Sequence, residues 1–338
     1  MRNLLVVISE YHLNLYRAGF LDYAKQKGIT IDYFMLDNKD NYNVFYRKMI
    51  KHNILNSKSK LYAHKKVEFR KKAKKYSECL FINLPEESKV LLNQDLSWLK
   101  KRIMFVDTMK DVKNYDKYSD FDKIFSLEYG DIEYGKKIGI EVNYIPICSS
   151  YHLFPTKECI KKYDISFVCL ATEKRLIYLE KIAEYCTKHN RTLFIAGHFW
   201  HNSNLINNIV GKIKFKYRYP FLYHYVKNEY LTPADLANIY TNSKICLNIN
   251  IAKHNSFNAR NFDIMIRKTI VITDKENLMG IDLLPDKEFV MADSPDDMIK
   301  KIDFYLTNES QRETIAANGY NSVKEKYLFQ HMLDKILQ

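Results

Sequence analysis

The chain has 338 residues, which exceeds one ordinary domain, so two α/β domains of about 150 residues each are the default expectation. Apolar residues make up 46% of it, which argues against wholesale disorder. The net charge of +13 indicates anionic partners: phosphorylated substrates, anionic lipid or nucleic acid. Neither G-x-G-x-x-G nor G-x-x-x-x-G-K-[ST] occurs, which argues against a dinucleotide-binding dehydrogenase and a P-loop NTPase.

The six cysteines are scattered, with no C-x-x-C pair and no Cys/His spacing typical of a metal site, so we expect reduced thiols. The apolar run from Leu4 to Ile8 is too short for the core of a signal peptide, and no run approaches the roughly 18 residues of a membrane span. The expected location is the cytoplasm, with a peripheral position on the inner face of the plasma membrane if the chain binds lipid.

The first half alternates short apolar runs with amphipathic stretches, which is typical of the βαβ units of parallel sheets. A helix fits between His12 and Lys27, because Gly28 then supplies a C-terminal stop. Strands are expected at Leu4–Ser9, Ile29–Met35, Cys79–Asn83, Arg102–Val106, Lys123–Leu127 and Val142–Ile145.

A basic segment from Arg47 to Lys75 carries twelve Lys or Arg residues against one acid, Glu68, and predicts one or two helices. A solvated basic helix is the first interpretation. A peripheral contact with an anionic membrane is the second, since each cation near such a surface contributes about 1 kcal/mol. Nucleic acid comes last and is not expected, because no recognised binding motif accompanies the charge.

A domain boundary is expected near Pro146 to Tyr163, where two prolines and a Cys-Ser-Ser turn interrupt the alternation. The second half resumes it with a helix whose core stripe runs from Leu179 to Cys186. Thr232 and Ser294 each open a helix as an N-cap before proline. Strands are expected at Ile165–Leu170, Thr192–Ala196, Ile245–Ile251, Thr269–Thr273 and Glu288–Met291.

The stretch from Ser243 to Asp274 carries the main chemical signal. A buried strand leads through a polar loop to a helix that begins near Asn258, and a helix start is a ready anion site. Arg260 in the first turn can grip a phosphate bidentately, and Asp263 lies one turn further on the same face. The alternative is a surface Arg–Asp pair that only stabilises the helix start.

These residues carry a resemblance. Leu247-Asn248, then Asn258-Ala259-Arg260-Asn261-Phe262-Asp263, then Ile270-Val271-Ile272-Thr273-Asp274 resemble a family pattern of "LN", N-x-R-x-F-E and "TD". Further matches in the same order are Tyr163–Val168, Ile195–Trp200 and Tyr305–Gly319. The span from Asp164 to about Leu328 thus resembles the C-terminal half of the bacterial spore-maturation-protein-like glycosyltransferases, which are similar to the family 4 enzymes of the GT-B fold.

The resemblance implies an α/β GT-B fold, with two Rossmann-like domains whose parallel sheets face a central cleft. Residues 1–155 would form the N-terminal acceptor-binding domain, and residues 156–322 the C-terminal nucleotide-sugar-binding domain. Residues 323–338 would form a C-terminal helix that crosses back to the N-terminal domain.

The resemblance also implies roles for individual residues of the second domain. Asp263 would bind the ribose hydroxyls, Arg260 the diphosphate, and Asn258 the phosphate or the donor sugar. The backbone around Tyr230 would lie near the base. Two weaker donor-site candidates follow the first two strands of this domain, Arg175 and His198. This chain departs from the family in having aspartate rather than glutamate at 263, and Met265–Lys268 in place of a small turn.

The base that deprotonates the acceptor would come from the first domain. His12 and Glu10 follow its first strand, and the imidazole has the more suitable ordinary pKa. The other interpretation of His12 is a solvated loop histidine, and Glu128 and Asp131 are comparable candidates. Asp120-Phe121-Asp122 matches the D-x-D string of metal-dependent transferases, but it precedes a strand, so no metal and no cofactor are expected.

The predicted function is transfer of a sugar from a nucleoside-diphosphate donor to a cell-surface glycan or lipid-linked acceptor, such as capsule or lipopolysaccharide. One alternative keeps the fold and changes the reaction: a sugar-nucleotide epimerase or a polyol-phosphate transferase. A second is a non-catalytic basic protein that binds nucleic acid or membrane.

Overall fold

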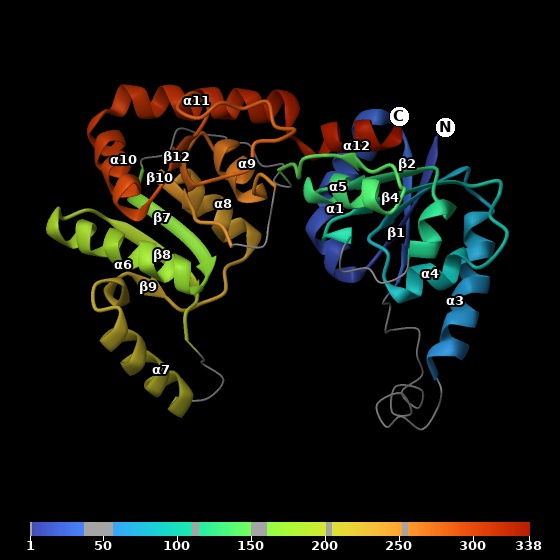
Figure 1. Cartoon of the computed structure of the whole chain (residues 1–338), viewed down its shortest axis with the longest axis horizontal. Coiled ribbons are helices and arrows are strands. Elements are labelled where there is room, and N and C mark those ends of the chain that lie inside the picture. Colours follow the sequence, from blue (N-terminus) through green and yellow to red (C-terminus); the bar gives the residue numbers. More distant parts are fainter. Residues whose placement is uncertain (1, 37–56, 110–114, 150–160, 201–204, 252–255) are drawn as a thin grey trace. The chain divides into compact units, whose positions relative to one another are not determined.

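The computed structural model describes residues 2–36, 57–109, 115–149, 161–200, 205–251 and 256–338. The chain divides into two compact units (Figure 1). Unit 1 consists of Met1–Pro146 and Phe329–Gln338, and unit 2 of Ile147–Leu328. Among the described residues, none of the helices combines the length and the apolar composition that crossing a bilayer requires.

Unit 1 is built on a six-stranded parallel sheet with the strand order β2-β1-β3-β4-β5-β6. Each predicted strand of the first half is present, with ends that differ by a few residues. The strands are β1 (Asn3–Ile8), β2 (Thr30–Met35), β3 (Glu78–Ile82), β4 (Lys100–Phe105), β5 (Lys123–Ser126) and β6 (Asn143–Tyr144).

The helices of unit 1 include the two that the sequence predicted. Helix α1 (Glu10–Lys27) begins at the N-cap Ser9 and ends at Gly28, whose φ of 62° is the left-handed conformation that glycine adopts most easily. Helix α3 (Ser57–Ala73) covers much of the basic segment, of which residues 47–56 lie outside the described part. The remaining helices are α4 (Glu86–Leu92), the 3-10 helix η3 (Tyr115–Asp120), α5 (Gly130–Lys137) and α12 (Phe329–Leu337).

The basic residues of α3 and of the turn after it are partly surface and partly structural. Arg70, Lys71, Lys74 and Lys75 are exposed, whereas Lys72 Nζ donates to the carbonyl oxygen of Tyr33 (2.7 Å). The first interpretation of this segment, a basic helix with a solvated face, agrees with these described side chains.

Helix α12 packs against α1, and two arginines bind the carbonyl end of the helix. The Phe329 ring stacks on Tyr16 and meets Phe20 edge-on. At the other end of the helix, the carbonyl oxygen of Leu337 accepts from Arg2 Nη2 (2.6 Å) and Arg102 Nη2 (3.4 Å). Cations at a helix C-terminus compensate its unpaired carbonyls and the negative end of its dipole.

A single carboxylate, that of Glu78, pairs with both arginines. Glu78 Oε1 accepts from Arg2 Nε (2.7 Å), and Glu78 Oε2 accepts from Arg102 Nη1 (2.7 Å). The Arg102 side chain is only 1% exposed and that of Glu78 is 16% exposed. Glu78 therefore holds a buried cation that also anchors α12.

Unit 2 contains a second six-stranded parallel sheet, in the order β12-β11-β10-β7-β8-β9. Its strands are β7 (Tyr163–Leu170), β8 (Leu193–His198), β9 (Val226–Lys227), β10 (Ser243–Asn248), β11 (Ile270–Asp274) and β12 (Val290–Ala292). The predicted strand at Ile245–Ile251 is too long at its end. It stops at Asn248, because the backbone N–H of Asn250 leaves the ladder and donates to the Asp274 carboxylate (2.9 Å).

The helices of unit 2 cover both faces of this sheet. The predicted capping box of Thr232 is present in α8, with Asp235 as its reciprocal acceptor. Helix α7 and strand β9 were not predicted. The helices are α6 (Glu173–Lys188), α7 (Leu205–Arg218), the 3-10 helix η4 (Leu222–His224), α8 (Pro233–Thr241), α9 (Ala259–Met265), α10 (Pro295–Thr307) and α11 (Glu309–Lys326).

The described cysteines are free and buried, and Cys159 lies outside the described residues. Burial raises the pKa of the Cys186 thiol to about 12 and of the Cys246 thiol to about 11. Both therefore behave as small buried hydrophobes at neutral pH.

Gly197 near the end of β8 is required by the sheet. Its φ is 141°, and a Cβ at this position would lie 1.8 Å from the carbonyl oxygen of Cys169 on β7. We expect Gly197→Ala to lower the free energy of unfolding by about 3 kcal/mol or more, since two backbones would have to separate. Thermal unfolding would measure this. Gly139→Ala is the matched control and should lower the free energy of unfolding by about 1 kcal/mol, because Gly139 has a φ of 74° but open space around it. Equal effects of the two changes would contradict the steric argument.

Candidate active site

The candidate site lies at the carboxyl edge of the unit 2 sheet, where β7 and β10 are neighbours. The chain runs from β7 outward to β8 on one side, and it reaches β10 and β11 on the other. The point where the strand order reverses opens a crevice beyond the strand ends, and ligands of parallel α/β sheets bind there. The residues that follow β7 and β10 are therefore the first to consider.

Arg175 ties the ends of these two strands together. It lies in the first turn of α6, where Thr172 is the N-cap. Arg175 Nε donates to the carbonyl oxygen of Ile249 (2.7 Å), and Nη1 donates to that of Leu170 (3.1 Å). The residue is only 3% exposed. Sequence reasoning proposed Arg175 as a donor-site residue, and the structure adds that it also holds the backbone of the crevice.

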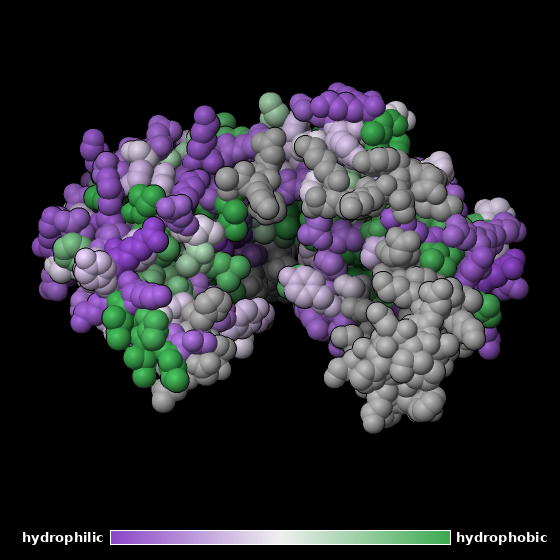
Figure 2. Space-filling view, turned by 60° about the horizontal axis from the view of Figure 1, so that its bottom comes forward, coloured by the Kyte–Doolittle hydropathy of each residue, from purple (hydrophilic) through white to green (hydrophobic). Residues whose placement is uncertain are grey.

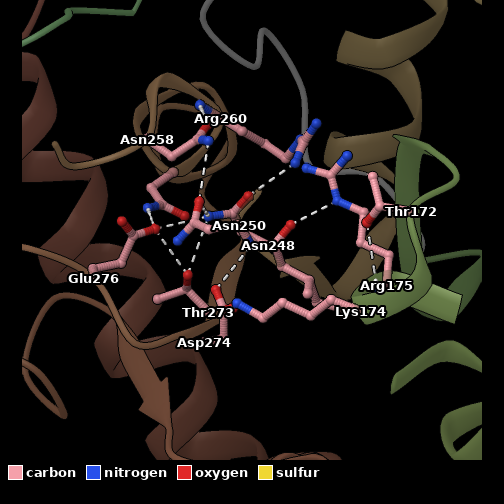
Figure 3. A network of polar contacts seen from close by, with 12 residues as sticks. Thr172, Lys174, Arg175, Asn248, Asn250, Asn258, Arg260, Thr273, Asp274 and Glu276 are labelled. Carbon is pink, nitrogen blue, oxygen red and sulfur yellow. Dashed lines mark hydrogen bonds and ion pairs between the residues drawn. The ribbon is translucent and has the colours of Figure 1, made fainter. Parts of the chain in front are cut away.

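The Arg260 side chain extends from α9 toward the Arg175 side chain, so that the two guanidiniums lie close together (Figure 3). The Phe167 ring on β7 lies under both guanidiniums, with its centroid 5.7 Å from Arg175 Cζ and 5.2 Å from Arg260 Cζ. Burial and then the charge of Arg260 lower the pKa of Arg175. Neither arginine forms an ion pair with a carboxylate of the described residues. Two adjacent guanidiniums without such a partner favour an anion between or in front of them.

A chain of polar contacts fixes the Arg260 side chain. Arg260 Nη1 donates to Asn248 Oδ1 (2.8 Å), and Asn248 Nδ2 donates to Glu276 Oε1 (2.8 Å). The same carboxylate oxygen accepts from Asn261 Nδ2 (2.7 Å) and Thr273 Oγ1 (2.9 Å). Glu276 thus orients the Asn248 amide so that its oxygen faces Arg260 (Figure 3).

Glu276 itself is a buried carboxyl two residues after β11. Burial raises its pKa, the neighbouring Asp274 charge raises it further, and hydrogen bonds from Asn261 and Thr273 oppose the rise. Asp274 in turn pairs with Lys174 at the start of α6. A connected set of amides, hydroxyls and charges from α6, β10, α9 and the end of β11 therefore lies at this sheet edge.

Helix α9 differs from the expected anion-binding helix start. It has seven residues, and Asn258 is its N-cap. Asn258 Oδ1 accepts from the backbone N–H of Arg260 (2.9 Å), and the Asn258 carbonyl accepts from that of Asn261 (3.0 Å). These two amides are thus satisfied within the protein. The positive charge of the site therefore comes from the side chains of Arg175 and Arg260 rather than from the α9 amides.

Asp263 lies one turn beyond Arg260 and is half-buried. Its Oδ1 accepts from Ser149 Oγ (2.8 Å), so the carboxylate also contacts the segment that enters unit 2. Burial raises the pKa of the nearby Tyr240 hydroxyl, the Arg260 charge lowers it and the Asp263 charge raises it. Arg260 and Asp263 therefore act on the same buried tyrosine.

The other predicted donor residues lie around the same sheet edge. His198 is the exposed last residue of β8, and its carbonyl oxygen accepts from the backbone N–H of Ala171 (3.1 Å). Tyr230 is 87% exposed in the loop between β9 and α8. Asn258 Nδ2 donates to Asn250 Oδ1 (3.1 Å), so its amide belongs to the polar network.

His12 in unit 1 lies at the equivalent point of the first sheet, where the order reverses between β1 and β3. Asn83 Oδ1 accepts from the backbone N–H of Val106 (2.7 Å), which directs Asn83 Nδ2 toward Asp107 Oδ2 (3.0 Å) and His12 Nε2 (3.4 Å). Nε2 is then the acceptor, and Nδ1 carries the proton toward Ser9 Oγ (2.7 Å). Contacts with β3, β4 and the helix start thus hold the imidazole in one tautomer.

The other candidate bases of unit 1 differ in their surroundings. Asp131 is 1% exposed, and its carboxylate accepts from Thr108 Oγ1 (2.9 Å), Met109 N (2.9 Å) and Ser126 Oγ (2.6 Å). These bonds give it a structural role and argue against Asp131 as the base. Glu10 is exposed at the start of α1, and Glu128 is half-buried after β5.

The D-x-D string lies away from the carboxyl edge. Asp122 precedes β5, and its Oδ2 accepts from the backbone N–H of Lys101 in β4 (2.6 Å). This contact joins the amino ends of two strands, opposite to the edge where such sheets bind ligands.

Sequence reasoning missed the residues that support the arginines. Asn248 was noted only as part of a motif, and Asn250 and Glu276 were not considered. Their signal is present in the sequence: polar side chains end or follow two apolar runs, at positions 248, 250, 273, 274 and 276. Strand ends of a parallel sheet bring such residues to one edge.

Known proteins are similar to this chain at the level of fold and domain. Residues 186–338 match a family described as glycosyl transferase-like, and no curated protein matches the sequence. Among solved structures, a glycosyltransferase from Rickettsia africae has a TM-score of 0.67 and 14% identity over 99% of this chain and 97% of that one. HepE of Anabaena in complex with UDP-glucose has a TM-score of 0.65 and 10% identity over 100% of this chain and 98% of that one. Sucrose-phosphate synthase from Thermosynechococcus elongatus has a TM-score of 0.64 and 11% identity over 100% of this chain and 98% of that one.

The fold is GT-B. This confirms the predicted α/β class with two parallel, Rossmann-like sheets. The glycosyl transferase-like family match over residues 186–338 supports the predicted enzyme class, a glycosyltransferase. The narrower resemblance to the spore-maturation-protein-like group stays a prediction.

Proposed function

We propose that this GT-B glycosyltransferase moves a sugar from a nucleoside-diphosphate donor to a cell-surface glycan or lipid-linked acceptor. The observation that carries the proposal is the pair of guanidiniums of Arg175 and Arg260 at the switch point of the unit 2 sheet. Departure of a nucleoside diphosphate places negative charge on the leaving phosphate, and prearranged cations stabilise such charge strongly in a partly buried site.

A uridine nucleotide is the donor class that we favour. HepE of Anabaena, which shares the fold, is described in complexes with UDP and with UDP-glucose. Asp263, with a carboxylate half-buried near Arg260, would accept hydrogen bonds from the ribose hydroxyls. The loop around Tyr230 would lie near the base, and Asn258 and His198 would line the donor site.

The test is a thermal-shift comparison of UDP, GDP, TDP and CMP, because a ligand that binds the native state raises the melting temperature by mass action. We expect UDP to raise it and CMP to have little effect. Incubation with the nucleotide sugar alone then separates the alternatives, since an epimerase converts it without an acceptor. Absence of any shift with all four nucleotides would contradict the proposal.

Metal independence forms part of the proposal. Arg175 and Arg260 supply two positive charges where metal-dependent transferases use a divalent cation, so we expect turnover to be the same in EDTA and in excess magnesium chloride. A strict requirement for the metal would show that the arginine pair does not suffice.

Asp263→Ala is expected to lower kcat/KM by about a hundredfold, which corresponds to lost contacts of ~3 kcal/mol. A donor with 2′-deoxyribose provides the sharper readout. If Asp263 binds the ribose, the wild type should discriminate against the deoxy donor and the variant should not. Equal discrimination by both proteins would remove Asp263 from the ribose site.

His12→Gln is expected to lower kcat by about a hundredfold while the Kd for the nucleotide stays unchanged, because we assign His12 to acceptor deprotonation. Steady-state kinetics and calorimetry measure the two quantities. His189→Gln in unit 2, where His189 stacks on Tyr185, is the matched control and should behave as wild type. A change in nucleotide affinity without a change in kcat would contradict the assignment.

The acceptor would bind to unit 1. The basic segment Arg47–Lys75, with Arg70, Lys71, Lys74 and Lys75 exposed, would hold unit 1 near an anionic lipid-linked acceptor. Charge-neutralising changes at these four positions should weaken use of a lipid-linked acceptor and spare a water-soluble one.

A further inference from the structure

Helix α7 of unit 2 carries apolar side chains on its outer surface. Five of them are exposed: Ile206 (72%), Ile209 (50%), Val210 (44%), Ile213 (63%) and Tyr217 (92%). The lower left of Figure 2 shows a hydrophobic patch in the region where Figure 1 has α7. Surface helices of globular proteins ordinarily turn such a stripe toward the core, so this arrangement calls for a partner.

The stripe is a continuous face of the helix. At about 100° per residue, the five side chains fall within an arc of roughly 100°. The opposite face packs on unit 2 through Phe215, which is 6% exposed, and through Asn208, which accepts from Trp200 Nε1 (2.9 Å). Gly211 lies on that same packed face, where a Cβ would come within 2.9 Å of Trp200. The apolar face therefore points away from the unit that holds the helix.

Basic residues flank the apolar face on both sides. By the same helical angles, Lys214 and Arg218 lie on one side of it, and Lys212 and Lys216 on the other. The helix contains no Asp or Glu. Among the described residues, Glu173 approaches one of these cations: its Oε1 is 3.7 Å from Arg218 Nη2, and both side chains are more than half exposed. Such an exposed pair leaves the field of the helix strongly positive.

We propose that α7 is an interfacial helix that lies in the surface of an anionic membrane. An apolar face with cations on both flanks inserts its apolar side chains at the level of the acyl-chain boundary, while the cations meet lipid phosphates. Pairing of α7 with a second copy of this chain is disfavoured, because it would bring two sets of four cations together. The inference concerns a different unit from the basic segment Arg47–Lys75, and it stands independently of sugar transfer.

The test is co-sedimentation with vesicles of equal parts phosphatidylcholine and phosphatidylglycerol, compared with phosphatidylcholine alone. The wild type should bind the anionic vesicles. The triple variant Ile206→Asn/Ile209→Asn/Ile213→Asn should lose about tenfold or more of that affinity. Lys212→Gln/Lys214→Gln/Lys216→Gln should bind weakly even at low salt. The matched control changes exposed apolar residues elsewhere, Leu21→Asn/Ile177→Asn/Leu284→Asn, and should bind as wild type.

A spectroscopic readout locates the helix directly. Tyr217→Trp should show a blue shift of its emission on addition of anionic vesicles, and Phe304→Trp on α10 should show none. Unchanged binding of the isoleucine triple variant, or equal loss in its control, would overturn the proposal. So would a wild type that dimerises through α7 and ignores vesicles. The isoleucine triple variant should still respond to UDP in the thermal-shift assay, so failure of the membrane proposal and failure of the proposed function are separable.

Discussion

Replacing Arg260 with alanine is expected to lower kcat by about a hundredfold or more and to weaken nucleoside-diphosphate binding, because it removes one of two cations that face the departing phosphate. The Asn248 amide positions this guanidinium through a 2.8 Å hydrogen bond, and the Phe167 ring supports it from below. Steady-state kinetics and calorimetry with the free nucleotide measure the two effects.

Two control variants define what the Arg260 experiment tests. Arg260→Lys keeps the charge but loses the planar fork, so we expect only partial recovery of kcat. Arg17→Ala removes an exposed arginine of α1 and should leave the kinetics unchanged. Near-wild-type turnover of folded Arg260→Ala would refute the assignment. Arg175 is a poor choice for the same purpose, since its loss would also release the ends of β7 and β10.

Replacing Glu78 with glutamine is expected to lower the free energy of unfolding by about 3 kcal/mol, because Arg102 would remain buried without its counter-charge. The change also loosens Arg2, and with it the end of α12. Urea unfolding followed by circular dichroism measures the loss. Glu184→Gln, which breaks an exposed pair with Lys188, is the control and should cost less than about 1 kcal/mol.

The wild type and Glu78→Gln should respond differently to acid. The hydrogen bond from Arg2, and then that from Arg102, lowers the pKa of Glu78 from 4.5 to about 2. A carboxyl with a lowered folded-state pKa stabilises the protein above its unfolded pKa, and the contribution disappears as the pH falls through the folded value. The stability difference between wild type and Glu78→Gln should therefore be full above pH 4.5 and vanish near pH 2. A difference that persists at pH 2 would contradict the charge-based explanation.

The buried strands were the part of the fold that sequence predicted best. The runs 4–8 in β1 and 270–272 in β11 are apolar and buried, because strands between two helical layers are covered on both faces. Strand β9 has two residues and therefore no periodic pattern to detect. Helix α7 has the spacing of an amphipathic helix, but its apolar stripe faces outward, so the usual link between periodicity and burial fails there.

The candidate site was predictable in its residue types and less so in its contacts. The position of Arg260 after a buried strand predicts the correct sheet edge. Its neighbour Arg175 is separated from it by half a domain of sequence, and only the order of β7 and β10 brings the two guanidiniums together. The role of Asn258 at the donor stays a prediction; its Oδ1 also caps α9, and local sequence alone does not distinguish a capping residue from a ligand-binding one.

The position of α12 at the end of the sequence, after the whole of unit 2, has a consequence for biosynthesis. Unit 1 is interrupted by the whole of unit 2, since its last portion, Phe329–Gln338, follows Leu328. On the ribosome, unit 2 can complete its sheet while unit 1 still lacks the helix that covers Gly19 and Phe20. The half of the molecule that is synthesised first is thus the last to mature, and until then its aromatic surface is open to chaperones.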